Sequence, residues 1–97
     1  MQAEEIRKNL LDIRYYYFRK KAFDKATLEV GENAIVKVVK QYNAIIVNAP
    51  PRLYDLYVSL YTQNTTQENL AEELNYSSDY IQKLHQKLMQ YFQENLS

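Results

Sequence analysis

Seven polar side chains near the C-terminal end of the chain have types that suit contacts with a nucleic acid. They are Ser77, Ser78, Asp79, Gln82, Lys83, Gln86 and Lys87. A glutamine amide can form two hydrogen bonds with an adenine edge, and a lysine ammonium can reach a guanine or a phosphate. Serine hydroxyls suit contacts with backbone phosphates. These residue types predict an interface for double-stranded DNA, although glutamine and lysine also simply solvate exposed helix faces.

A single helix over residues 78–96 would place most of these side chains together. At about 100° per residue, Gln82, Lys83 and Gln86 project from the side opposite an apolar row. The apolar row consists of Ile81, Leu84, Leu88, Tyr91 and Phe92. Ser77 or Ser78 is a suitable N-cap for this helix, and Asp79 suits its first turn.

A shorter helix is predicted immediately before it, which gives the layout of a helix-turn-helix. The pattern T-x-x-E from Thr65 to Glu68 predicts a capping box at its start. After the helix, Asn75 can adopt the left-handed conformation that a tight turn needs. Ala71 is small enough for a close crossing, and the expected buried anchors include Leu70, Leu74 and Tyr76. An ordinary helical hairpin is the alternative.

The stretch "APPRLYDLYVSLYTQNTTQENLAEELNYSSDYIQKLHQKLMQYF", residues 49–92, resembles the region 4 helix-turn-helix of sigma factors. It is similar in particular to the small sigma-like regulators of phages and mobile elements, of the ArpU type. The resemblance implies promoter binding, transcriptional control and contact with RNA polymerase. Asn75 stands where that family usually has glycine, and the second helix has fewer arginines than a typical member.

The N-terminal segment predicts a helix over residues 3–25 with apolar rows on two nearly opposite sides. One row is Ile6, Leu10, Ile13 and Tyr17, and the other is Leu11, Tyr15, Phe18 and Ala22. Two rows suggest a helix held between its own core and a second copy, so the second row predicts a homodimer. The run "RYYYFRKKAF", residues 14–23, could also be a stacking patch for nucleic acid, but its rings would project to different sides of a helix.

The middle of the chain predicts a connector and two further helices. Residues 26–33 are expected to be a connector, with Gly31 free to adopt positive φ. Residues 34–48 favour a helix, whose period fits every apolar position except Val36 and Val47, and their β-branched content leaves a hairpin as the alternative. Pro51 can begin the next helix, and its apolar stripe is Leu53, Leu56, Tyr57 and Leu60.

Residues for catalysis or metal binding are scarce. Cysteine is absent, and a single glycine excludes a glycine-rich phosphate loop. The only histidine, His85, has no metal or triad partner one turn away on its own helix, so it is expected to be solvated or half-buried. We therefore expect no enzyme activity, no metal and no cofactor.

Charge and hydropathy limit the partners and the compartment. Twelve basic and twelve acidic residues cancel, so general affinity for nucleic acid is not expected, and attraction to phosphates must come from a local face. Candidates for that face are residues 14–25, Lys37, Lys40 and Arg52. No apolar stretch is long enough for a membrane span, and the start of the chain is acidic and polar, unlike a signal peptide. We expect a cytoplasmic, nucleoid-associated protein.

Together these observations predict an all-α fold: a small bundle of four to five helices with a C-terminal helix-turn-helix. Residues 1–97 are expected to form one domain, with an N-terminal dimerisation or packing part (1–48) and a helix-turn-helix part (49–97). The expected function is sequence-specific DNA binding in transcriptional control for a phage, plasmid or mobile element. The alternative is a protein-interaction module of the same shape that binds RNA polymerase or another regulator, which the acidic Glu68, Glu72 and Glu73 favour.

Overall fold

The first helix, α1 (Ala3–Phe18), forms where apolar side chains recur on one side of the chain and meet the core. In the computed structural model, which describes residues 1–96, Ile6, Leu10 and Ile13 are fully buried. Tyr16 completes the buried face, and Tyr17, which was expected there, is only partly buried. The fold is all-helical, as predicted, and residues 1–96 contain six α-helices, one π-helical turn and no strand.

The predicted continuous helix over residues 3–25 is wrong, because the chain bends at Arg19. A second helix, α2 (Lys20–Val30), starts after the bend and runs through most of the predicted connector. In a straight helix, residues 16 and 23 would be separated by about 10 Å along the axis. The bend brings the Phe23 ring to 5.4 Å from the Tyr16 ring. A hydrogen bond of 3.0 Å from the Tyr16 hydroxyl to Asp24 also holds the corner. This bend accounts for the additional helix.

The third helix, α3 (Ala34–Ile46), confirms the predicted helix and excludes the hairpin. The Asn33 side chain caps it by accepting a hydrogen bond of 2.9 Å from the Val36 amide. Val36 is buried, contrary to its predicted place off the apolar face, because that face is centred on Val36, Val39, Tyr42 and Ile46. Before the helix, Gly31 has φ of 88°, as expected for the short connector.

The fourth helix, α4 (Pro51–Tyr57), begins at Pro51 as predicted and continues into a π-helical turn, η1 (Val58–Thr62). All four residues of its predicted apolar stripe are buried. In the π-helical turn, the Gln63 amide donates to the carbonyl of Val58 at 2.9 Å. The wider turn also brings Tyr61 into the core.

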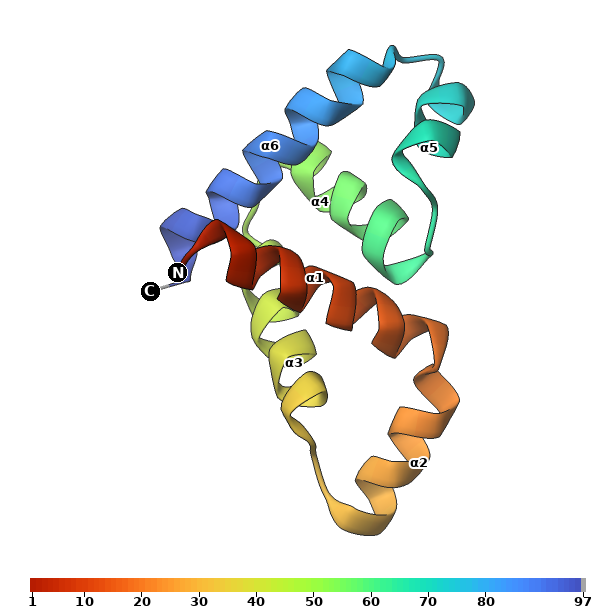
Figure 1. Ribbon diagram of the computed structural model, residues 1–97, viewed down its shortest axis with the longest axis vertical. Helices are drawn as coiled ribbons and strands as arrows, with labels where there is room; N and C mark the ends of the chain where they lie inside the picture. The colour runs from red at the N-terminus through yellow and green to blue at the C-terminus, as the bar shows by residue number, and fades with distance from the viewer. Residues whose placement is uncertain (97) are drawn as a thin grey trace.

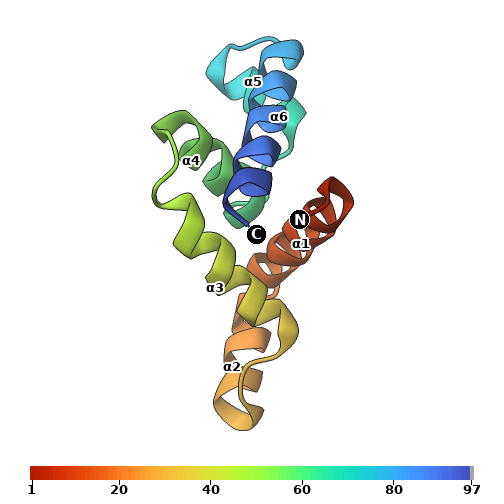
Figure 2. The same cartoon turned by 90° about the vertical axis from the view of Figure 1, so that its left-hand side faces the viewer.

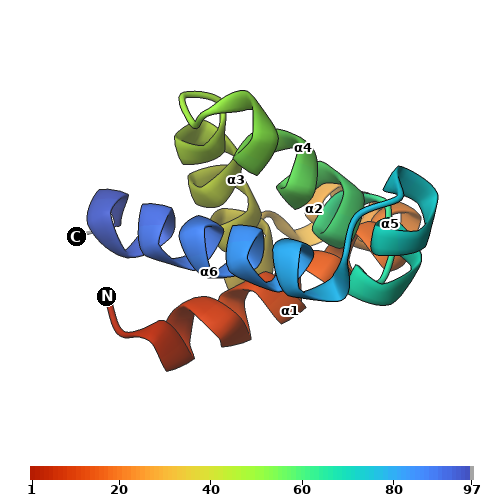
Figure 3. The ribbon, with the colours of Figure 1, turned by 90° about the horizontal axis from the view of Figure 1, so that it is seen from above.

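The last two helices, α5 (Gln67–Leu74) and α6 (Ser78–Asn95), complete the fold. In Figure 1, α1 crosses the middle of the molecule, with α4, α5 and α6 on one side and α2 and α3 on the other. Figure 2 shows α2 at the end of the molecule away from the turn between α5 and α6. Viewed from above, α1 and α6 run side by side and the two termini lie at the same end (Figure 3).

The core is rich in tyrosines whose hydroxyl groups are hydrogen-bonded. The rings of Tyr42 and Tyr57 lie 4.7 and 5.9 Å from the ring of Phe92. The Tyr57 hydroxyl donates to Asn43 at 2.8 Å, and Asn9 donates to the Tyr42 hydroxyl at 3.1 Å. Within residues 1–96, no buried side-chain nitrogen or oxygen lacks a partner, so these polar groups cost the core little. None of the helices in this range is sufficiently long and apolar to cross a membrane.

Candidate nucleic-acid interface

The turn between α5 and α6 has the left-handed conformation that the sequence predicts. Asn75 has φ of 60° and ψ of 33°. Its amide donates to the Glu72 carbonyl at 3.3 Å, and the amide of Tyr76 donates to the Ala71 carbonyl at 2.9 Å. This pair of bonds is a Schellman motif, which ends α5 sharply and lets α6 start three residues later.

The caps of the two helices are partly as predicted. Thr66, and not Thr65, caps α5, and its hydroxyl accepts a hydrogen bond of 3.1 Å from the Asn69 amide. The predicted capping box with Glu68 therefore does not form. The amide of Thr65 donates a hydrogen bond to the carbonyl of Ser59, the second residue of the π-helical turn, which places Thr65 before the cap. At the start of α6, Ser77 is the N-cap and accepts from the Tyr80 amide at 3.1 Å.

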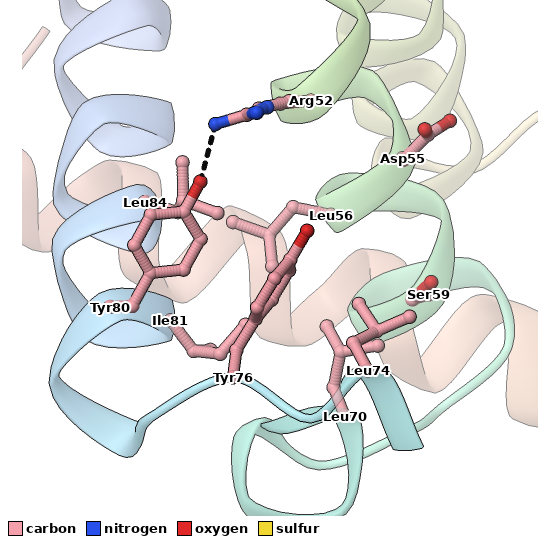
Figure 4. A pocket seen from close by; sticks show the side chains of 10 residues that line it. All are labelled: Arg52, Asp55, Leu56, Ser59, Leu70, Leu74, Tyr76, Tyr80, Ile81 and Leu84. Atoms are coloured by element: carbon pink, nitrogen blue, oxygen red, sulfur yellow. Dashed lines mark hydrogen bonds between the residues drawn. The ribbon is translucent and has the colours of Figure 1, made fainter. Parts of the chain in front are cut away.

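The crossing of the two helices is packed by fewer anchors than predicted. Leu70, Ala71 and Ile81 are buried there. Leu74 and Tyr76 are instead 51% and 45% exposed, which corrects the prediction that both are buried anchors. Both line the rim of a cavity of about 200 Å³ between α4, α5 and α6 (Figure 4). They stay partly exposed because α4 borders this cavity without filling it.

All seven residues predicted to contact DNA are exposed on the start of α6 and the turn before it. Gln82, Lys83 and Gln86 lie on the outward face, opposite the buried Ile81 and Leu88. This arrangement leaves two amide groups and an ammonium free to meet base edges. Ser77 already accepts one hydrogen bond as the cap, so its hydroxyl remains available as a donor.

A groove of about 560 Å³ runs along one flank of this outward face. Its cations are Lys83 and Lys87 from α6 and Arg52 from the first turn of α4. No carboxylate lines the groove, and none of the three cations forms an ion pair within residues 1–96. A hydrogen bond of 2.6 Å from Arg52 to the Tyr80 hydroxyl holds the guanidinium beside α6 (Figure 4). The groove is therefore a local concentration of positive charge on a chain with no net charge, of the kind that phosphate contacts require.

Other cations expected to help lie elsewhere or are already paired. Lys20 forms an ion pair with Asp24 at 2.6 Å, and Lys40 forms one with Glu32. Residues 20–25 belong to α2, away from the turn between α5 and α6 (Figure 1), whereas Arg14 on α1 lies beside the start of α5. On the other flank of α6, a cleft between the starts of the two helices is lined by Gln67, Glu68, Ser78 and Gln82. Sequence analysis did not single out Gln67, because its position depends on how α5 crosses α6.

His85 is half-buried, which is one of the two predicted alternatives. Its hydrogen-bond partner belongs to another element. Its Nε2 lies 2.5 Å from the Tyr61 hydroxyl of the π-helical turn. Burial lowers the pKa of His85, and the nearby Arg14 and Arg7 lower it further. The imidazole is therefore mostly neutral at neutral pH. No group of three or more potential metal ligands was found among residues 1–96.

The predicted dimer row is exposed, although the bend at Arg19 divides it between α1 and α2. Leu11 and Phe18 are 59% and 72% exposed, and Tyr15 and Ala22 are also exposed. Helix α2 has no buried residue, and Leu28 near its end is 89% exposed. The apolar surface of the α1–α2 corner is thus larger than the predicted row, and sequence analysis did not include Leu28.

Comparison with known proteins provides no relative for this chain: no family model, no curated protein and no solved structure matches it.

Proposed function

We propose that this protein binds double-stranded DNA sequence-specifically and regulates transcription. The observation that carries the proposal is the outward face of α6, where Gln82, Lys83 and Gln86 are exposed directly after the left-handed turn at Asn75. A recognition helix contacts base edges with its N-terminal half, and these residues lie in that half. The resemblance of residues 49–92 to sigma region 4 and to ArpU-type regulators extends the proposal to a phage, plasmid or mobile element and to contact with RNA polymerase.

Charge on the flank of α6 supports the same function. Arg52, Lys83 and Lys87 would meet phosphates along the groove edge while the glutamines contact bases. The side chains of Glu68 and Asp79 are negative near the same surface, so total affinity depends strongly on these three cations. Binding should therefore weaken steeply as salt is added.

The experiment is selection of duplexes from a random pool, followed by binding measurements on single alanine variants. Gln82→Ala and Gln86→Ala should each weaken binding to the selected duplex by about 1–3 kcal/mol and relax the preference at one base position. Lys83→Ala should also weaken binding. Gln93→Ala is the matched control, because Gln93 is an exposed glutamine later on the same helix. If the pool yields no selected sequence, or if the control loses as much affinity as the other variants, the proposal is wrong.

A homodimer is part of the proposal, because the α1–α2 corner exposes apolar side chains that a monomer would leave in water. Tyr15 and Phe18 on α1 and Leu28 on α2 form this surface, whereas Leu11 of the predicted row lies in a cleft with Arg7, Arg14 and His85. Two copies would present two recognition helices and would double the weak field of a chain with no net charge. The selected duplexes should then contain two related half-sites.

A second function is favoured by the surface of α5. Glu68, Glu72 and Glu73 are exposed there, and Leu74 and Tyr76 add exposed apolar area at its end. Such a surface suits a protein partner such as RNA polymerase better than it suits phosphates. Alanine at Glu72 and Glu73 should leave DNA affinity unchanged or improved. If those variants abolish polymerase binding while Gln82→Ala has no effect on DNA binding, the interaction module is the correct function.

A further inference from the structure

Besides the groove of Arg52, Lys83 and Lys87, a basic cavity lies on the other side of α6. Arg14 lines this cavity, and two contacts hold its guanidinium in place. Arg14 Nε donates to the Leu60 carbonyl at 3.0 Å, and the guanidinium carbon lies 5.0 Å from the centre of the Tyr61 ring. Both partners, the Leu60 carbonyl and the Tyr61 ring, belong to the π-helical turn η1. Two contacts on one guanidinium hold it in place, and they leave its terminal nitrogens available for a ligand.

The cavity has a volume of about 390 Å³ and gathers positive charge without a counter-ion. Its polar lining consists of Arg7, Arg14, Tyr61, Thr66, Gln67 and His85. Arg7 and Arg14 are seven residues apart on α1, so they lie on the same side of that helix. No carboxylate lines the cavity, and neither arginine has an ion-pair partner among the described residues.

The cavity is next to the proposed recognition surface. Gln67, the first residue of α5, lines both this cavity and the cleft that contains Ser78 and Gln82. His85 follows Gln82 by one turn of α6. Helix α1, which carries the two arginines, runs beside α6 (Figure 3). A ligand in the cavity would therefore lie on the flank of α6 opposite the groove of Arg52, Lys83 and Lys87.

We propose that this cavity binds one phosphate group of the DNA backbone, held between the guanidinium groups of Arg7 and Arg14 at the start of α5. Arginine suits this role because its planar donors match phosphate oxygens. Phosphate contacts on both flanks of α6 would fix the position of the helix on the duplex, while its glutamines contact bases. The inference rests on the proposed function, and free inorganic phosphate provides a probe of the cavity alone.

His85 makes the first test specific, because it is the only histidine in the chain and its ring resonances need no assignment. The pKa of His85 is measured by NMR in sodium phosphate and in sodium chloride of equal ionic strength. A bound phosphate offsets the charges of Arg7 and Arg14, so the pKa of His85 should be higher in phosphate than in chloride. The shift should saturate with phosphate concentration.

The matched variants are Arg7→Gln and Lys8→Gln, which remove one positive charge each from neighbouring exposed positions of α1. The Arg7 variant should lose the phosphate-specific shift, and the Lys8 variant should retain it. Arg14 is a poorer choice, because its loss would also leave the Leu60 carbonyl without its partner. Equal shifts in phosphate and chloride, or an equal shift in the Arg7 variant and the wild type, would overturn the cavity as a phosphate site.

The second test asks whether the phosphate is that of DNA. With the selected duplex, Arg7→Gln should reduce the slope of log affinity against log salt by about one, which makes its defect about fourfold larger at 50 mM than at 200 mM salt. Lys8→Gln should leave the slope unchanged. If the duplex binds and both variants have the wild-type slope, this inference fails and the proposed function stands. If phosphate shifts His85 but no duplex binds, the DNA source fails together with the proposed function.

Discussion

Asn75 is the residue on which the angle between α5 and α6 depends most directly. Its left-handed conformation, with φ of 60°, costs roughly 1–2 kcal/mol for a residue with an ordinary side chain. Asn75→Ala should therefore lower the free energy of unfolding by about 1 kcal/mol, as measured by urea denaturation. Asn75→Gly should be at least as stable as the wild type, because glycine adopts this conformation without a clash. An Asn75→Gly variant that is less stable than Asn75→Ala would contradict this account.

His85 gives the stability of the protein a dependence on pH. Burial, followed by the charges of Arg14 and Arg7, lowers its pKa below the ordinary 6.5 in the folded state. The unfolded chain then binds a proton more readily than the folded chain. Protonation of His85 therefore does not lower the free energy of unfolding well above pH of about 6.5, and lowers it progressively as the pH falls below that value. The decrease stops once the pH is below the folded pKa, where both states are protonated.

The measurement is the free energy of unfolding in urea between pH 5 and pH 7, in buffers without phosphate. His85→Gln should be less stable than the wild type at pH 7, because glutamine replaces an imidazole bonded to Tyr61, and it should lack this part of the pH dependence. Asp24 also has a lowered pKa, caused by its hydrogen bonds with Lys20 and Tyr16, but it titrates in more acidic solution. An unchanged pH dependence in the variant would show that another group causes it.

At the scale of the elements, two neighbouring threonines before α5 have different roles. Thr66 caps the helix, whereas the Thr65 side chain has no capping role and only its backbone amide is bonded, to Ser59. Thr66→Ala should cost about 1 kcal/mol of stability, the usual cost of removing an N-cap, and Thr65→Ala should cost much less. Thermal unfolding of the two variants measures the difference. A larger loss of stability in Thr65→Ala than in Thr66→Ala would instead support the predicted capping box of Thr65 and Glu68.

Elements that depend on local signals could be predicted from the sequence. Pro51 begins α4, Asn75 ends α5 and Ser77 caps α6, and each acts through its own backbone or side chain within one turn. The fully buried row of Ile81, Leu88 and Phe92 follows from the helical period alone.

Elements that depend on contacts between distant segments could not be predicted in this way. The bend at Arg19 is stabilised by packing of Phe23 on Tyr16, and the sequence around it favours one continuous helix. The π-helical turn displaced the cap from Thr65 to Thr66. The cavity with Arg7 was missed for the same reason, because its lining comes from α1, η1, α5 and α6, which only the fold brings together.

At the scale of the whole molecule, the corner of α1 and α2 is the surface least explained by a single chain. The molecule is 44 Å long, and α2 lies at one end of it, with no buried residue (Figure 2). Phe18 is 72% exposed on α1, and Leu28 and Val30 are even more exposed on α2. An isolated helix of eleven residues is marginal in water. Within one copy, Phe23 packs α2 against Tyr16 and the core, and the proposed dimer would add packing to the rest of the helix.

A second copy would supply this packing, and a double variant tests it. Phe18→Asp combined with Leu28→Asp should change a dimer to a monomer in sedimentation equilibrium, because both charges would be buried at the interface. The monomer should remain folded by circular dichroism, since neither side chain belongs to the core. Its affinity for a duplex with two half-sites should fall much more than its affinity for one half-site, because linked binding is lost. Arg19→Gln and Lys21→Gln, exposed substitutions in the same region, form the control pair. A wild-type protein that is monomeric at all concentrations, or a double variant that remains a dimer, would remove the α1–α2 corner from the interface.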